Sequence, residues 1–289
     1  MDLAMSTAEN TQNNSLLTLL QQSLKANNFT LPPLPDSATK VRKAIDDPEV
    51  DCEKVAKIIR VDPVLSGRLI QAANSPLFKG VTNIEDLNTA ISRLGLKCVQ
   101  NLVISLTVSS LFKNAAKPWV RRKFSQLWEV SIKIAALSEV LARSRKGLDG
   151  GEALLAGLLH DIGAIPIIIL CDEKFGEPSD PEDLNTALQQ LSPPLTSWIL
   201  RKWHLSESIV SLPEDVADLT REGNEKVDYA DVVQVARLHT WRGKKHPLGN
   251  VSWLDVPAFQ KLGLTPEESI EAIKESHDDI KEVMSLLKS

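Results

Sequence analysis

The sequence predicts an all-α protein, and three observations support this prediction. Apolar residues recur at alternating spacings of three and four along most of the 289-residue chain, which is the period of a helix with one buried face. Aromatic residues make up only 4% of the chain, and no segment shows the apolar and polar alternation of a half-buried strand. Helix signals bound the periodic segments, such as the capping pair Asp62-Pro63 and the stop at Gly95.

Composition and charge describe a globular chain and argue against one class of partner. With 43% hydrophobic and 25% charged residues, the chain can bury a substantial core. Its net charge of −5 argues against a nucleic-acid partner, because phosphate binding needs a concentrated positive face. Two basic clusters remain, Lys113 to Lys123 and Arg242 to Lys245. We interpret each as a solvated surface and not as a phosphate-binding patch.

The cysteines and the apolar segments indicate a cytoplasmic protein. Cys52, Cys98 and Cys171 show no paired spacing, so neither a disulfide framework nor a zinc ribbon is expected. The first residues lack the basic start and the apolar run of a signal peptide. The apolar run at residues 164–170 is too short to span a bilayer and is interpreted as a buried helix end. We therefore expect no membrane partner.

The first half of the chain is predicted to form a helical lobe behind a disordered tail. Residues 1–14 are too polar to bury the apolar surface that folding requires. A first helix is expected from Ser15 to about Asn27. The segment Leu31-Pro32-Pro33-Leu34-Pro35 should be extended, because each proline disfavours helix in the residue before it. We assign residues 15–115 to this lobe, with three helices within 36–74 and further helices at 84–94 and 96–112.

The second half is predicted to form another helical lobe, residues 116–245, covered by C-terminal helices at 246–289. Its long first helix carries a continuous apolar stripe formed by Leu127, Val130, Ile134, Leu137 and Leu141. A helix that contains His160 and Asp161 is expected between the Gly150-Gly151 break and the loop that starts at Asp172. Further helices are expected at 184–191, 198–203 and 227–241, and Pro193-Pro194 separates the first two of these. The C-terminal helices are expected at 256–262 and 265–287, the last with the start signature Thr265-Pro266.

One histidine and one aspartate, His160 and Asp161, stand side by side in the otherwise apolar segment Ala156 to Ala164. Neighbours on a helix point about 100° apart, so the two side chains can share an ion only where other helices flank them. Ala156 and Gly157 leave room one turn earlier. The alternative is a buried polar pair kept for folding, in which the carboxylate has a compensating partner.

The segment Gly157-Leu-Leu-His160-Asp161-Ile-Gly163 resembles the centre of the HD superfamily of metal-dependent phosphohydrolases. In that superfamily a further histidine lies one helix upstream, and an aspartate closes the metal site from a later helix. The resemblance places these two ligands at Val130 and Arg237, and neither side chain binds a metal ion. The resemblance therefore implies an HD fold that has lost its catalytic metal site and uses no metal or other cofactor.

A wider set of motifs resembles the HDOD family, the HD-related output domains of bacterial signalling proteins. The set, in the family's order, is Leu31-Pro-Pro-Leu-Pro, Ile59-Arg-Val-Asp62-Pro63, Ala73-Asn74-Ser75, Ala90-Ile91-Ser92-Arg93-Leu94-Gly95 and the His-Asp-Ile-Gly segment. Trp203-His204-Leu205 resembles the family's Trp-Gly-Leu turn. The match runs from about residue 29 to the C-terminus. It implies a two-lobed helical architecture, with an HD-like bundle in the C-terminal lobe, and a regulatory role.

We interpret the chain as a non-catalytic output module that transmits a signal by binding another protein. If the second lobe keeps the HD arrangement, Arg237 projects toward Asp161, and we hypothesise a bidentate ion pair in place of the metal. The alternative is a weak metal-dependent phosphohydrolase acting on a nucleotide or cyclic dinucleotide, with His160 and Asp161 as surviving ligands. Its replacement ligand would be Glu129 or another carboxylate from elsewhere in the chain. A third interpretation is a module that binds a nucleotide without chemistry.

Overall fold

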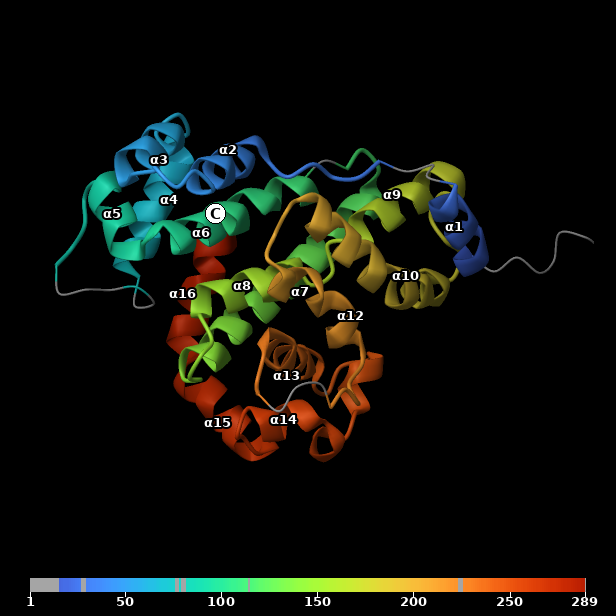
Figure 1. Ribbon diagram of the computed structural model, residues 1–289. Coiled ribbons are helices and arrows are strands. Elements are labelled where there is room, and N and C mark those ends of the chain that lie inside the picture. Colours follow the sequence, from blue (N-terminus) through green and yellow to red (C-terminus); the bar gives the residue numbers. More distant parts are fainter. Residues whose placement is uncertain are drawn as a thin grey trace, which may run out of the picture.

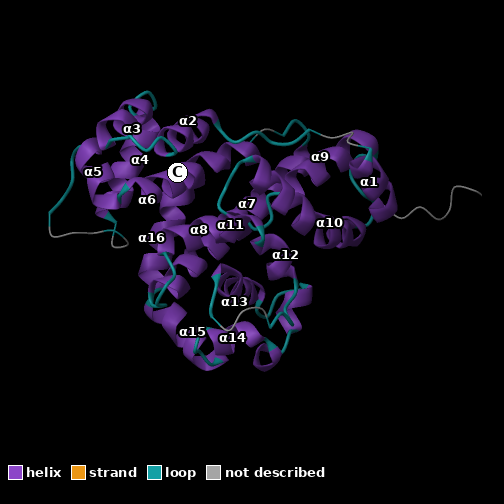
Figure 2. Cartoon of the chain, viewed as in Figure 1, coloured by secondary structure: helices purple, strands orange, loops and turns teal. Residues whose placement is uncertain are grey.

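All regular elements in the described part of the protein are helices, which confirms the predicted all-α class. The computed structural model describes residues 16–26, 30–75, 78, 82–113, 115–222 and 226–288. Within these ranges, Figure 2 shows helices joined by loops, and no strand. The predicted disordered tail, residues 1–14, lies outside the described residues.

The first lobe is a small bundle in which aspartates cap three of the helices. The side chains of Asp51, Asp62 and Asp86 accept hydrogen bonds from backbone N–H groups in the first turns of α3, α4 and α5, which satisfies otherwise unpaired donors. Gly95, with φ of 76°, ends α5 and starts α6, as the sequence predicts. The elements are α2 (Asp36–Ile45), α3 (Cys52–Ile59), α4 (Pro63–Asn74), α5 (Leu87–Leu94), α6 (Leu96–Val108) and the 3₁₀ helix η1 (Ser109–Phe112).

The second lobe is organised around the long helix α7, which contacts α8, α9 and α13. Its buried face includes Ile134 and Leu137, both members of the predicted apolar stripe, while Leu127 and Val130 are partly buried against the same core. The elements of this lobe are α7 (Pro118–Arg143), α8 (Gly150–Leu159), α9 (Ala164–Lys174), α10 (Pro181–Lys202), α11 (Glu207–Val210), α12 (Leu212–Ala217) and α13 (Tyr229–Trp241).

The C-terminal helices connect the two lobes. Helix α16 packs on α7 and also contacts α4 and α6 of the first lobe (Figure 1). Arg68 of α4 donates a hydrogen bond to the Leu286 carbonyl at 2.6 Å, and Arg143 of α7 pairs with Asp279 at 2.7 Å. The predicted single segment 265–287 is divided into two helices at Ser276. The elements are η2 (Pro247–Asn250), η3 (Trp253–Asp255), α14 (Pro257–Lys261), α15 (Pro266–Glu275) and α16 (His277–Lys288).

A buried carboxylate also joins the lobes. Glu152 of α8, only 6% exposed, accepts a hydrogen bond from Lys97 of α6 at 2.6 Å and from Ser208 at 2.7 Å. Ser206 donates a third hydrogen bond to the same carboxylate at 3.3 Å. The buried negative charge of Glu152 is therefore compensated by Lys97 from the first lobe and by two serines from the second. Removing either contribution would leave the carboxylate without full compensation.

Helix α1 (Leu16–Lys25) packs on the second lobe and not on the first lobe, to which the sequence analysis assigned it. It contacts α9 and α10 at the opposite end of the molecule from α2 to α5 (Figure 1). The proline-rich segment that follows is extended, as predicted. It runs across the second lobe, where the Trp203 indole donates a hydrogen bond to the Pro32 carbonyl at 3.1 Å.

Helix α10 is continuous where the sequence predicts two helices separated by Pro193-Pro194. Both prolines lie inside the helix, although each removes a backbone donor and crowds the preceding turn. The surrounding residues Leu195, Thr196 and Ile199 are buried. Their tertiary packing outweighs the local preference of the prolines, so the predicted break is wrong.

The segment Gly150–Lys174, which contains α8 and α9, is long and apolar enough to cross a membrane by composition alone. Its most apolar window has a mean hydropathy of 2.1, and 89% of that window is buried within the fold. Helix α5 and the stretch Leu96–Phe112 are long and apolar enough to cross a membrane only when they are counted together. The two are bent by 111° relative to each other. Burial of this extent is what core helices require, because neighbouring helices then remove their side chains from water.

The end of α10 predicts a stabilising substitution at His204. The N–H groups of His204 and Leu205 donate to the carbonyls of Arg201 and Leu200, which is the Schellman arrangement. His204 has φ of 55°, a left-handed conformation that costs a non-glycine residue roughly 1–2 kcal/mol. Glycine relieves this strain but also makes the unfolded chain more flexible, which offsets part of the gain. His204→Gly should therefore increase the free energy of unfolding in urea by about 0.5–1 kcal/mol. His204→Ala should not, and an equal gain from both would contradict this explanation.

Candidate functional site

The residues His160 to Gly163 form a turn between α8 and α9, and not the interior of one helix as the sequence predicts. The backbone N–H groups of Ile162, Ala164 and Ile165 bond to carbonyls three residues earlier at 3.1 to 3.2 Å. Such bonds tighten the chain relative to an α-helix. The backbone is therefore tightened at the position of the His160-Asp161 pair.

Two glycines let neighbouring helices approach this turn closely. A Cβ atom on Gly157 would lie 2.8 Å from the Ala135 Cα of α7, and one on Gly163 would lie 2.6 Å from the Ser192 carbonyl of α10. The Gly163 N–H donates to Thr196 Oγ1 at 2.9 Å. The room that small residues leave beside the pair is thus filled by the backbones of α7 and α10.

His160 is buried and held as a neutral imidazole. Its Nδ1 lies 2.7 Å from the Gly157 carbonyl, so Nδ1 carries the proton and Nε2 keeps its lone pair. Burial, together with the positive charge of Arg237, lowers the pKa of His160 to about 3, against a smaller opposing effect of the Gly157 hydrogen bond. The ring is therefore in the form that could accept a hydrogen bond or bind a metal ion.

Asp161 has a close partner on α10. The Ser192 hydroxyl donates a hydrogen bond to Asp161 Oδ1. Burial raises the pKa of the Asp161 carboxyl, while the Ser192 hydrogen bond and the Arg237 charge act to lower it. Asp161 as a whole residue is partly buried.

Arg237 lies near the pair but does not form the bidentate ion pair that we hypothesised. None of its nitrogen atoms lies within 4.0 Å of an Asp161 oxygen, and its Nη1 donates instead to the Val216 carbonyl of α12 at 2.8 Å. Burial lowers the pKa of the guanidinium and the Asp161 charge raises it. A guanidinium keeps its proton in proteins, so a fixed positive charge acts on both His160 and Asp161 over a longer distance than an ion pair.

The remaining two predicted positions offer no donor to the pair. Val130 is partly buried against the apolar core, and Glu129, the proposed replacement ligand, is exposed on α7. Among the residues that the structure describes, no group of three or more His, Cys, Asp or Glu side chains could hold a metal ion. His160 and Asp161 alone, beside a fixed cation, do not fit a divalent metal centre.

The hydrogen-bond partners of Asp161 and Arg237 could not be predicted from the sequence. Ser192 precedes two prolines in a segment that predicts a helix break, and nothing in its neighbourhood marks it as a partner of Asp161. The Val216 carbonyl is a backbone group, whose role depends on the position of α12 alone. Both contacts join residues more than twenty positions apart, so only the folded chain reveals them.

The buried His160 predicts a loss of stability in acid. Histidine in the unfolded chain has a pKa of about 6.5, so below this pH the unfolded chain binds a proton that the folded protein, with a pKa of about 3 at His160, does not. The stability that neutral His160 contributes is complete above about pH 6.5 and decreases as the pH falls toward 3. Between pH 7 and pH 5 the loss through His160 should be about 2 kcal/mol.

The measurement is urea unfolding of wild type and His160→Gln at both pH values. The decrease in unfolding free energy should be smaller by about 2 kcal/mol in the variant, whatever its stability at pH 7. His277→Gln, at an exposed position, is the matched control and should follow wild type. Equal decreases in wild type and His160→Gln would show that His160 is not protonated on unfolding.

Comparison with protein families identifies the domain to which this site belongs. The family model described as HDOD domain matches residues 31–216, from the proline-rich segment to α12. Among curated proteins, an uncharacterized protein of Treponema pallidum (strain Nichols) is 24% identical over 195 residues. That match covers 63% of this chain and 36% of the relative, so the chain spans about a third of the relative's length.

Crystal structures of similar proteins share the fold. A protein of Shewanella amazonensis SB2B, named as a candidate metal-dependent phosphohydrolase, superposes with a TM-score of 0.80 at 26% identity over 94% of this chain and 98% of that one. An HDOD domain protein with unknown function from Geobacter sulfurreducens gives 0.64 at 21% identity, over 94% and 97% of the two chains. A candidate signal transduction protein of Marinobacter aquaeolei VT8 gives 0.59 at 20% identity, over 96% and 62%.

Proposed function

Because the chain belongs to the HDOD family, which is related to the HD phosphohydrolases, we propose that it is a regulatory module that acts by binding a protein partner and not by catalysis. The observation that carries this proposal is the charge at Arg237. The guanidinium of the partly buried Arg237, bonded to the Val216 carbonyl, acts on His160 and Asp161 where a metal-dependent enzyme needs a carboxylate.

Electrostatics explains why this cation is incompatible with metal catalysis. A divalent ion held by His160 and Asp161 would lie close to the guanidinium of Arg237. At a separation of roughly 6 Å and an effective dielectric constant of about 20, the repulsion amounts to about 5.5 kcal/mol. Two protein donors do not offset such a cost, because known metal centres of this kind use at least three.

The test is metal content and phosphatase activity on protein purified without chelators or an affinity-metal step. Elemental mass spectrometry should find the same substoichiometric iron, manganese and zinc in wild type and in the double variant His160→Ala, Asp161→Ala. Neither protein should hydrolyse p-nitrophenyl phosphate with added Mn²⁺. Asp255→Asn, at an exposed position, is the control for unspecific binding. Stoichiometric metal and activity that the double variant loses would overturn the proposal.

The alternative function is a weak metal-dependent phosphohydrolase of the HD superfamily. It is favoured by the 26% identity to the Shewanella protein that carries such a name. His160 also supports this alternative, because its unprotonated Nε2 can bind a metal ion. It requires a third ligand from elsewhere in the chain, and the assay above separates it from the proposed function.

The third candidate function, binding of a nucleotide without catalysis, needs its own test. Asp161 and Arg237 are both only partly buried residues. Only Nη1 of Arg237 takes part in the Val216 hydrogen bond, so the other nitrogen atoms could donate to a phosphate group. Such a ligand would raise the melting temperature of wild type and not of Arg237→Met. We expect no shift with ATP or GTP, because the Asp161 carboxylate would repel the phosphates.

A further inference from the structure

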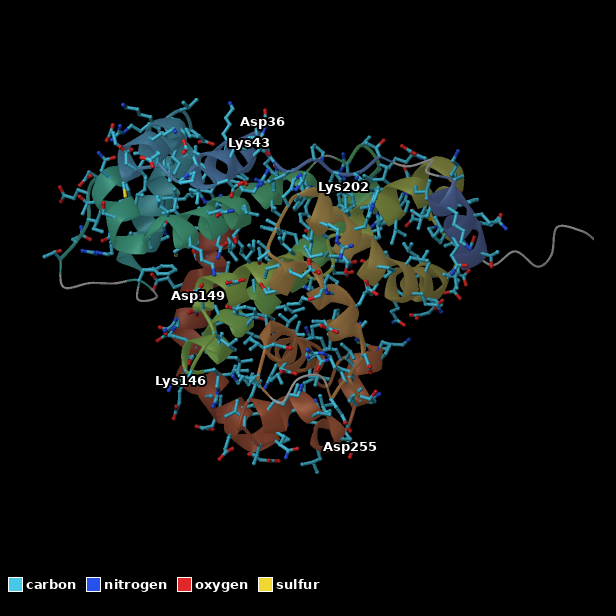
Figure 3. The ribbon with its side chains drawn as sticks, viewed as in Figure 1. Asp36, Lys43, Lys146, Asp149, Lys202 and Asp255 are labelled. Atoms are coloured by element: carbon cyan, nitrogen blue, oxygen red, sulfur yellow. The ribbon has the colours of Figure 1, made fainter. Side chains whose placement is uncertain are left out.

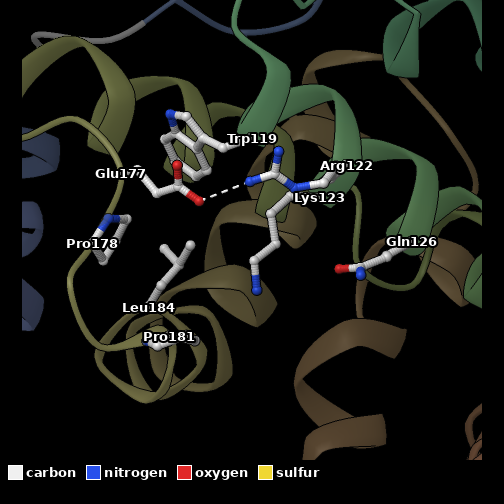
Figure 4. A pocket seen from close by; sticks show the side chains of 8 residues that line it. All are labelled: Trp119, Arg122, Lys123, Gln126, Glu177, Pro178, Pro181 and Leu184. Carbon is white, nitrogen blue, oxygen red and sulfur yellow. Dashed lines mark hydrogen bonds and ion pairs between the residues drawn. The ribbon is translucent and has the colours of Figure 1, made fainter.

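A small cavity lies at the start of α7, away from the His160 turn. It has a volume of about 160 Å³ and is walled by α7, the start of α10 and the loop between α9 and α10. Figure 4 shows Lys123 and Gln126 on the α7 side and Leu184 on the α10 side. Cavities for drug-sized ligands measure at least ~300 Å³, so this one fits a single apolar side chain better than a whole small molecule.

The apolar part of the cavity is already shaped. Trp119 and Leu184, which are buried, and Pro178 and Pro181 form its non-polar walls. The Trp119 indole is fixed by a hydrogen bond to Asp172 at 2.8 Å. Walls made of prolines and anchored aromatic rings lose little conformational entropy when a ligand binds.

The polar part of the cavity carries one uncompensated positive charge. Arg122 pairs with Glu177 at 2.9 Å, with both side chains more than half exposed. Lys123 is half-buried, and among the residues that the structure describes it has no hydrogen bond or ion pair. Lys117 pairs with Asp172. Within the basic cluster Lys113 to Lys123, Lys123 is therefore a cation directed into a cavity and not simply a solvated side chain.

The loop that contributes Glu177 and Pro178 to the cavity also carries an exposed aromatic residue. Phe175 lies two residues before Glu177 in the loop after α9 and is 43% exposed, which is unusual for a side chain of this size.

We propose that this cavity binds an acidic peptide segment of the partner protein, with one apolar side chain in the cavity and a neighbouring carboxylate on Lys123. The inference rests on the proposed function, since it names the surface and the kind of partner for a protein-binding module. Charge complementarity supports it: the chain has a net charge of −5, so an acidic segment is attracted only where a local cation such as Lys123 faces it. The exposed pair of Arg122 and Glu177 is weak and can open for the segment.

The test uses a capped peptide, Glu-Leu-Asp-Glu, and its uncharged counterpart Gln-Leu-Asn-Gln. Titration is followed by the Trp119 indole N–H resonance in a ¹H–¹⁵N spectrum, assigned through a Trp119→Phe variant. The acidic peptide should shift this resonance saturably and should bind about fivefold more tightly than the uncharged peptide. Raising the ionic strength should weaken binding.

The variant Lys123→Gln should bind the acidic peptide about fivefold more weakly, and Lys123→Arg should bind like wild type. The control is Lys146→Gln, because Lys146 is exposed beyond the far end of α7, roughly 30 Å along that helix (Figure 3). Unchanged affinity in Lys123→Gln would overturn the proposal. So would an equal Trp119 shift with inorganic phosphate, because the site would then bind any anion.

Failure of this inference and failure of the proposed function give different results. If the peptide does not bind but the protein has no metal-dependent activity, the partner is bound at another surface. If activity depends on His160 and Asp161, the proposed function is wrong whatever the peptide does.

Discussion

Replacing Gly163 by alanine is expected to destabilise the protein by about 3 kcal/mol. The added Cβ would lie 2.6 Å from the Ser192 carbonyl, 2.7 Å from Thr196 Oγ1 and 2.8 Å from the Thr196 backbone nitrogen. Two of these atoms belong to the backbone of α10, which cannot move by a side-chain rotation. The helix must shift, and the hydrogen bond from Ser192 to Asp161 would be disturbed with it.

The matched control for this substitution is Gly67→Ala. A Cβ on Gly67, in the middle of α4, meets no atom within 4 Å. Alanine is favoured over glycine inside a helix by about 1 kcal/mol, so this variant should be slightly more stable than wild type. Urea unfolding followed by circular dichroism measures both effects. A Gly163→Ala variant as stable as wild type would mean that α10 does not pack on the turn as described.

Replacing Asp231 by alanine is expected to cost about 3–5 kcal/mol. The Asp231 side chain is fully buried and pairs with Arg221 at 3.1 Å and with Lys261 at 3.2 Å. It also accepts a hydrogen bond from the Asp228 backbone and completes the capping box of α13. Its loss removes the ion-pair partner of the largely buried Lys261, while Arg221 keeps its pairs with Asp228 and Asp215. Since α13 carries Arg237, the start of that helix also positions the charge at the candidate site.

Two further variants separate charge compensation from simple loss of packing. Asp255→Ala, at an exposed position in η3 (Figure 3), should change stability by less than about 0.5 kcal/mol. Adding Lys261→Met to Asp231→Ala should recover part of the loss, because the cation that has lost its ion-pair partner Asp231 is then removed. If the double variant is no more stable than Asp231→Ala, the cost comes from the capping box and not from the buried charges.

The candidate site could be recognised but not assembled from the sequence. The His160-Asp161 doublet, the apolar Val130 and the cationic Arg237 are visible as residue types in a known motif order. Their contacts are not, because each is made with a group distant in the chain: Ser192 for Asp161 and the Val216 carbonyl for Arg237. The predicted bidentate ion pair failed for this reason, since the position of α12 gives Arg237 a different acceptor.

The sequence by itself determined the helices of this protein, because their signals are local. The capping aspartates Asp51, Asp62 and Asp86, the left-handed Gly95 and the capping box at Thr265 each act within four residues of the helix end that they define. The family resemblance could also be recognised from the sequence, because its motifs are short and local too.

Only the tertiary structure decided where these helices lie and where their regular geometry is interrupted. It keeps α10 continuous through Pro193-Pro194, tightens the chain at His160 to Gly163, places α1 on the second lobe and directs Lys123 into a cavity. Each of these features depends on packing between residues far apart in the chain. Such contacts can outweigh a local preference of a few kcal/mol, and no short stretch of sequence contains them.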